Sequence, residues 1–207
     1  MDLTELQADL LKEAFNLGVG RAARALGDLA GGEEILLSVP NVLLVSRADL
    51  EQRIVATSGD EVCGVSEAFG GPFAGQAMML YSQRESLELV RIMLGGIIPI
   101  EELSEMEGEA LCEVGNVVLN AVISTLANLM EMEIDTDIPR LYKGPCGEVL
   151  DNTMGGSLEQ KVLYLRMRFQ FSKHDLAGHI GFFLDITDGA VLATHLEDYF
   201  RKMIGAE

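Results

Sequence analysis

Basic residues are scarce in this chain of 207 residues, which has 15 lysines and arginines against 33 aspartates and glutamates and a formal net charge of −18. An acidic surface does not attract nucleic acids or anionic membranes, so we expect neither as a partner. A protein partner with basic residues around its own site fits this charge better. The alternative stays open that the acidity only keeps the protein soluble or reflects a salty environment.

Cysteine and histidine are also few, with three of each. An odd number of cysteines without C-x-x-C spacing predicts reduced thiols of a cytoplasmic protein rather than a disulfide framework or a metal site. Ordinary buried or exposed histidines are favoured over a zinc site, so we expect no metal of the protein's own. The cysteines are Cys63, Cys112 and Cys146.

Targeting and membrane signals are missing as well. The first ten residues, MDLTELQADL, contain acids and no basic region, so we expect no signal peptide. No apolar run approaches the roughly 18 residues that a membrane-spanning helix needs. With 48% hydrophobic residues, the chain can build a packed core as one domain, 1–207.

A polar stripe on an otherwise apolar helix is the most informative feature. The apolar residues of segment 105–130 predict a helix, on which Glu109, Glu113, Asn116 and Asn120 lie within roughly 60° of arc. A helix this apolar should be largely buried, so its polar line needs an explanation. We interpret it as a functional edge on which Glu113 and Asn116, one turn apart, act on one bound group.

The same stripe occurs 100 residues earlier on a predicted helix at 3–30, where it consists of Asp9, Glu13, Asn16 and Gly20. One E-x-x-N pair is weak evidence, because two common residues often reach this spacing by chance. Two copies on two apolar helices are much harder to attribute to chance. They indicate a duplicated functional feature.

Glycines predict how the first of these helices packs and ends. Gly18 and Gly20 lie inside it, where each costs about 1 kcal/mol relative to alanine, and this cost suggests close approach of either another helix or a partner's backbone. Gly31 and Gly32 predict its C-terminal end.

The order of predicted elements repeats in two halves, about 1–100 and 101–207. Segment 73–80 aligns with 176–183, and strands joined by short turns favour antiparallel pairing. We therefore expect an α/β (α+β) fold with pseudo-two-fold symmetry, a largely antiparallel sheet and long motif helices packed on it. The first half is predicted to have strands 35–45, 62–69 and 73–82, a short helix or turn at 49–55 and a helix at 85–94. The second is predicted to have strands 133–142, 162–171 (half-exposed) and 176–186, a loop at 143–156 and a helix at 188–203.

Each Asn is followed at a similar distance by a proline, Pro40 after Asn16 and Pro139 after Asn116. Two E-x-x-N helices, these prolines and a length near 200 resemble the CheC/CheX/FliY family of CheY-P phosphatases, over essentially the whole chain. Pro40 lies one residue later than the family pattern, and Glu109 stands where that pattern has Asp or Ser. Two motif copies favour the CheC branch over CheX, and the lack of a further C-terminal domain argues against FliY. The FliM middle domain is similar in fold but lacks the catalytic pairs.

The resemblance implies hydrolysis of the aspartyl phosphate on a CheY-like response regulator. It further implies that each Asn orients the attacking water and each Glu pairs with a lysine of the receiver, while the receiver itself supplies Mg²⁺ and the chain needs no cofactor of its own. A non-catalytic adaptor that binds a phosphorylated receiver or a CheD-type deamidase is the alternative, and a structural role in the flagellar switch is less favoured. The implied catalytic residues are Glu13, Asn16, Glu113 and Asn116, and the implied partner-binding residues are Asp9 and Glu109, for which ordinary surface acids remain the alternative.

Overall fold

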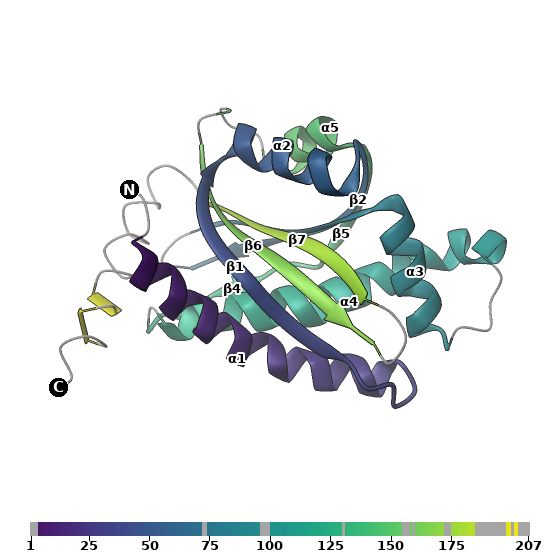
Figure 1. Ribbon diagram of the computed structural model, residues 1–207, viewed down its shortest axis with the longest axis horizontal. Helices are drawn as coiled ribbons and strands as arrows, with labels where there is room; N and C mark the ends of the chain where they lie inside the picture. Colours follow the sequence, from purple (N-terminus) through teal and green to yellow (C-terminus); the bar gives the residue numbers. More distant parts are fainter. Residues whose placement is uncertain are drawn as a thin grey trace.

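Two long helices and an antiparallel sheet dominate the computed structural model (Figure 1). The structure describes residues 4–71, 74–95, 100–129, 131–154, 158, 160–171, 175–184, 198–199 and 201–202. The helices are α1 (Glu5–Leu29), α2 (Arg47–Ser58), α3 (Gln83–Met93), α4 (Ile100–Leu129) and α5 (Cys146–Met154). The strands are β1 (Leu36–Ser46), β2 (Glu61–Gly70), β3 (Gly75–Ser82), β4 (Asp135–Thr136), β5 (Arg140–Pro145), β6 (Lys161–Gln170) and β7 (Asp175–Leu184).

The strands form one sheet in the order β1-β6-β7-β3-β2-β4, with β5 also paired to β2. Every pairing in the described part of the chain is antiparallel, which confirms the predicted fold class. The central strands of the sheet are β7 and β3, which pair with each other. On one side of this centre β1 pairs with β6, and on the other side β5 pairs with β2. A duplicated chain would produce such an order, and the division into two related halves stays a prediction.

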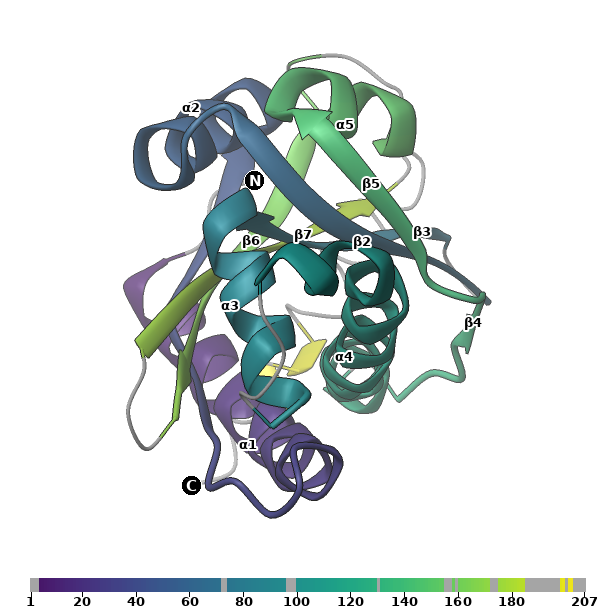
Figure 2. The ribbon, with the colours of Figure 1, turned by 90° about the vertical axis from the view of Figure 1, so that its right-hand side faces the viewer.

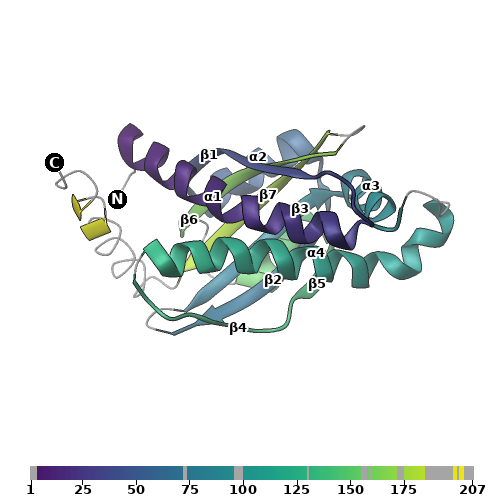
Figure 3. The same cartoon turned by 90° about the horizontal axis from the view of Figure 1, so that it is seen from below.

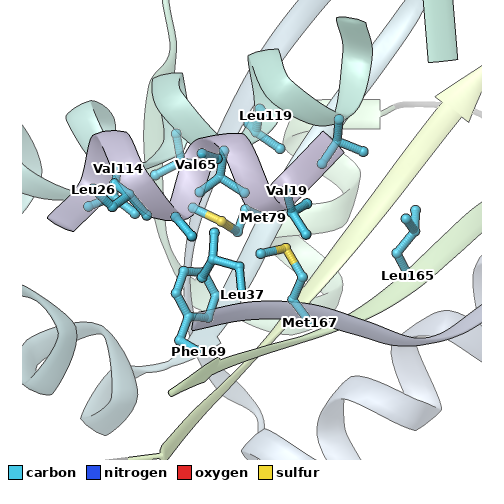
Figure 4. Close-up of a cluster of buried hydrophobic side chains, with 14 of the residues drawn as sticks. Val19, Leu26, Leu37, Val65, Met79, Val114, Leu119, Leu165, Met167 and Phe169 are labelled. Carbon is cyan, nitrogen blue, oxygen red and sulfur yellow. The ribbon is translucent and has the colours of Figure 1, made fainter. Parts of the chain in front are cut away.

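Helices cover both faces of the sheet, as Figure 2 shows, with α1, α3 and α4 on one side and α2 and α5 on the other. Alternate side chains of the strands therefore face two different cores. In the larger core, Val19 of α1 and Val114 of α4 pack against Val65, Met79 and Leu165 of the sheet (Figure 4). All five are at most 1% exposed. Burial of each such side chain contributes about 1.5–3 kcal/mol, so this core fixes α1 and α4 on the sheet.

The helices α1 and α4 run antiparallel, side by side, across their face of the sheet (Figure 3). A Cβ atom on Gly18 would lie 1.9 Å from the Thr125 hydroxyl oxygen, so the predicted close approach at this glycine is confirmed. At Gly20 no described atom lies within 4 Å of that position, so no helix approaches it, and the alternative of a partner's backbone stays a prediction there. Gly31 and Gly32, with φ of 70° and 92°, follow the end of α1 as predicted.

Two predictions for the region between α4 and β6 are wrong. The predicted strand 133–142 is split into β4 and β5, because Pro139 has no N–H to donate to a neighbouring strand. The predicted loop 143–156 contains the end of β5 and the helix α5. Its glycines and Asn suggested a loop, but Cys146, Val149 and Leu150 follow helical spacing and are all buried against the sheet.

Some boundaries and exposures also differ from expectation. The helix α4 begins at Ile100, five residues before the predicted start. Residues 162–165 of β6 are all buried, so the predicted half-exposed strand is wrong there, because helices cover both faces of the sheet. Of the predicted helix 188–203, only residues 198, 199, 201 and 202 lie within the described part of the chain, and these are helical.

One segment meets the length and composition of a membrane-spanning helix, which corrects the expectation that no apolar run approaches that length. This segment, Met106–Leu129, forms most of α4, and half of its apolar 18-residue window is buried inside the fold. The core helix of a folded domain meets the same criteria, because both environments select apolar residues.

A buried histidine lies on the α2 side of the sheet. His179 of β7 is 2% exposed, and its Nδ1 is 2.8 Å from the Tyr164 hydroxyl oxygen. Its Nε2 is 3.1 Å from the hydroxyl oxygen of Thr57 and 3.0 Å from that of Ser58. Burial, with a smaller effect of Arg166, lowers the pKa of His179 to about 4. The histidine is therefore neutral and hydrogen-bonded at neutral pH, and no three metal-ligating side chains cluster among the described residues.

We expect His179 to make the protein less stable in mild acid. The folded-state pKa of about 4 lies below the ordinary value of 6.5, so the unfolded chain binds the proton more readily. The stability from neutral His179 is complete above pH 6.5 and is lost as the pH falls towards 4, by about 2 kcal/mol between pH 7 and pH 5. Urea unfolding at both pH values measures this loss. His179→Gln, which cannot titrate, should have a smaller loss, and an equal loss in both proteins would contradict the assignment.

Candidate functional site

The two predicted stripes lie on the sides of α1 and α4 that face away from the sheet. This outer surface follows from the apolar pattern, because the opposite side of each helix is buried in the core. The stripe residues are therefore turned outward rather than into the interior, with two partial exceptions. Exposed members are Asp9, Glu13, Gly20, Glu109, Glu113 and Asn116, and Asn16 and Asn120 are half-buried.

A groove of about 390 Å³ runs between α1 and α4 beside the first pair. Glu13 and Leu17 line it from α1, and Thr125 lines it from α4. Leu17 is 72% exposed, an unusual position for a large apolar side chain, whereas Leu11 and Leu26 of the same helix are fully buried in the core. Gly18 also lines the groove, and the Thr125 hydroxyl of α4 occupies the place where a Cβ atom of this residue would lie.

Asn16 is bound to the backbone of β1. Its Nδ2 donates to the carbonyl oxygens of Lys12 at 2.7 Å and Val39 at 3.1 Å. Its Oδ1 accepts the Val39 N–H at 2.7 Å. Both ends of the amide are therefore occupied, and Asn16 does not present a free polar atom to a bound group in this structure.

Pro40 explains why this contact forms. The register between β1 and β6 shifts between Ser38 and Asn41, which leaves Val39 and Pro40 outside the regular ladder. Val39 is completely buried, so its free N–H and C=O need partners, and Asn16 supplies both. The spacing between Asn16 and Pro40 thus has a structural function in the first half of the chain.

Asn116 has different surroundings. Its Oδ1 accepts a hydrogen bond of 2.9 Å from Asn120 Nδ2, which also donates to the Asn116 carbonyl oxygen at 2.9 Å. No described residue bonds its Nδ2, and the side chain is exposed. Ile138, which precedes Pro139 as Val39 precedes Pro40, is 83% exposed. The second pair can therefore present an amide N–H to a bound group.

The carboxylates of the stripes also differ in their availability. Asp9 forms an ion pair with Lys12 at 2.5 Å, which neutralises much of its charge. Among the ion pairs found in the described residues, none includes Glu13, Glu109 or Glu113. These three acids are free to meet a cationic side chain of a partner.

Two polar residues near the second pair escaped the sequence analysis. Thr136 of β4 donates to Asn120 Oδ1 at 3.0 Å, and Glu67 of β2 lies beneath, 1% exposed. Pattern analysis of one helix could not find them, because other elements bring them to the site. The available signal was the single acid at an inward position of β2, between Val65 and Phe69.

No family model matches the chain, whereas individual known proteins are similar to it. The CheY-P phosphatase CheC of Bacillus subtilis (strain 168) is 25% identical over 151 residues, which cover 72% of this chain and 71% of that protein. The crystal structure of Thermotoga maritima FliY superimposes with a TM-score of 0.75 at 20% identity, over 98% of this chain and 99% of that one. The FliM middle domain from H. pylori gives a TM-score of 0.63 at 10% identity, over 92% and 99%. The two structural similarities show a shared fold.

We expect the two asparagines to differ in their effect on stability. Asn16→Ala leaves the buried N–H and C=O of Val39 without partners, which should lower the free energy of unfolding by about 1–3 kcal/mol. Asn116→Ala removes an exposed side chain and should change it by less than about 0.5 kcal/mol. Urea unfolding of the two variants measures the difference. Equal losses would contradict the bound state of Asn16.

Proposed function

The chain belongs to the CheC/CheX/FliY family, and from this premise we propose that it hydrolyses the aspartyl phosphate of a CheY-like response regulator. The observation that carries the proposal is the exposed Glu113–Asn116 pair, a carboxylate and a neutral amide one turn apart on α4, with a second such pair on α1. The B. subtilis relative, whose name includes this activity, supports it.

In the proposed reaction the receiver brings its own Mg²⁺ and lysine, and this chain supplies the missing orientation of water. The water oxygen forms a bond to phosphorus as the bond from phosphorus to the aspartyl oxygen breaks, which releases inorganic phosphate and the free carboxylate. The water proton passes to the phosphate or to solvent. Phosphoryl transfer depends mainly on position and charge stabilisation, so one well-placed amide can accelerate it.

Asn116 fits this role through its nitrogen. Because its Oδ1 already accepts from Asn120, the free Nδ2–H groups face solvent. One of them can donate to the water oxygen and leave a lone pair directed at phosphorus. A neutral amide is better suited here than a carboxylate, which the phosphoryl oxygens would repel.

Glu113 and Glu13 are proposed to bind the receiver's lysine rather than to act as general bases. Each lies one turn before its Asn and is exposed, so it can fix the position of the receiver along the helix. The net charge of −18 attracts a partner with a basic rim, to which Glu109 and Asp9 would contribute. Of these two acids, Glu109 is more available to a partner, because Asp9 already forms an ion pair with Lys12.

The hydrogen bonds of Asn16 favour a role in binding, without catalysis, for the first Glu–Asn pair. While Asn16 holds Val39, the Glu13–Asn16 pair can bind a receiver but cannot orient water. If the Asn116 pair were also idle, the chain would be an adaptor that sequesters a phosphorylated receiver or binds a CheD-type deamidase. A cytoplasmic location and the absence of a cofactor of its own stay predictions.

We expect Asn116→Ala to lower the rate of phosphate release from a phosphorylated receiver by at least about tenfold, since loss of one transition-state donor costs on the order of 10²–10³ in kcat. Asn16→Ala should reduce the rate less, and the double variant should reach the rate of the receiver alone. Single-turnover phosphate release, with binding of the receiver measured in parallel, tests this.

Leu36→Ala, an exposed change on the far strand β1, serves as a control and should keep the full rate. A double asparagine variant with full activity would contradict the mechanism. Tight binding of the phosphorylated receiver without any acceleration in the unmodified protein would establish the adaptor.

A further inference from the structure

Glu67 is a buried carboxyl group without a hydrogen-bond partner. It lies in the middle of β2, 1% exposed, and neither of its two oxygens bonds any group in the described part of the chain. Alternation along the strand places it between Val65 and Phe69, on the face that packs against α4. An unpaired buried carboxyl destabilises a fold, so its presence beneath the second pair calls for a functional reason.

The polar groups that face Glu67 belong to the second site. They are the side chains of Asn120 and Thr136, together with the charge of Asp137. Burial raises the pKa of the Glu67 carboxyl group, and the two polar side chains oppose this increase. The Asp137 N–H donates to the Ala68 carbonyl oxygen at 2.9 Å, which holds this segment beside β2.

A directional set of hydrogen bonds leads from this position to the surface. The Thr136 hydroxyl donates to Asn120 Oδ1 at 3.0 Å, and Asn120 Nδ2 donates to Asn116 Oδ1 at 2.9 Å. Each donor thereby fixes the orientation of the next amide, and Asn116 is left with its Nδ2–H groups outward. Glu67 lies at the buried end of this series.

The surroundings of the first pair have apolar or small residues at the matching positions. Glu67 pairs with Ala77 of β3, and Leu165 pairs with Ile180 of β7, two positions that align between the halves. Leu165 is fully buried, and Gly20 stands where the second half has Asn120. A leucine is thus compatible with this position in the fold. The buried carboxyl group is found only near the second pair, whose Asn116 amide is free.

We propose that Glu67 is a positioning residue for Asn116, which it orients through Thr136 and Asn120 so that the Asn116 amide presents its N–H groups to the bound phosphoryl group and water. This proposal rests on the proposed function. A protonated Glu67 can donate to the Thr136 oxygen, which leaves the Thr136 hydroxyl hydrogen for Asn120 Oδ1 and so keeps both N–H groups of Asn120 Nδ2 on Asn116. An ionised Glu67 would compete with Asn116 for these N–H groups, and the proposed orientation therefore uses the protonated carboxyl.

The test replaces Glu67 in the full-length chain with leucine, the residue at the matching position. E67L removes an unpaired carboxyl and should unfold at the same or a higher temperature. The side-chain amide resonances of Asn116 and Asn120 should shift in ¹H–¹⁵N spectra, while those of Asn16, held by Val39, stay in place as an internal control. With a phosphorylated receiver, kcat should fall about fivefold at unchanged KM, because binding of the receiver does not involve Glu67.

Further variants separate positioning from packing. E67Q keeps hydrogen-bonding capacity and should restore most of the turnover and the Asn116 resonance. Thr136→Val removes the exposed hydroxyl group that donates to Asn120. It should shift the Asn120 and Asn116 resonances, and it tests the proposal even if E67L does not fold. Ser66→Ala, at the neighbouring position on the opposite face of β2, should change neither the resonances nor kcat.

Two results would overturn the proposal. Asn116 resonances that stay in place in T136V and in a folded E67L would show that Glu67 does not orient Asn116. A shift without any change in kcat, in a protein that does release phosphate, would show that the orientation has no effect on the reaction. If the unmodified protein releases no phosphate from any receiver, the proposed function fails, and the resonances alone decide whether Glu67 fixes Asn116.

Discussion

The arrangement of the site depends on the direct contact between α1 and α4 at Gly18. Because a Cβ atom on Gly18 would collide with the Thr125 side chain of α4, the glycine lets the two helices lie side by side on the sheet and share one outer surface. Their inner faces are fixed by the core, so the rotation of each helix is set by packing, and the polar stripes must point outward. Exposure of the Glu–Asn pairs is thus a consequence of helix packing and needs no special loop. A site on two packed helices is also held more rigidly than a site on loops, as a reaction that depends on position requires.

Sequence periodicity predicted much of this structure, for identifiable reasons. The long helices and the strands β2, β3, β6 and β7 have strong apolar patterns, and the glycines after α1 end it as expected. Helix α5 was missed because its glycine, Asn and Asp content resembles a loop, although its three buried residues are held by the sheet. Local composition was outweighed there by tertiary contacts, which one segment alone does not contain.

For the site, the sequence predicted which residues face outward but not what they bind. The outward direction of Glu113 and Asn116 follows from the helical period alone. The bond from Asn16 to Val39 depends on a register shift in β1, and the place of Glu67 depends on which strand lies under α4. Both are long-range features, set by the pairing of strands far apart in the chain. The one local signal for Glu67 was an acid among inward-facing apolar residues, which is unusual enough to identify in other sequences.

The difference between the two pairs follows the backbone around their prolines. The segment from Asn16 to Pro40 is one residue longer than that from Asn116 to Pro139. Pro40 lies within β1, where the register shift leaves the buried Val39 outside the regular ladder, so Val39 offers its N–H and C=O to Asn16. Pro139 lies between β4 and β5, and no described backbone group there bonds the Asn116 side chain. The same Glu-x-x-Asn spacing can therefore occur twice in one chain, once with its Asn held by a strand and once with its Asn amide exposed.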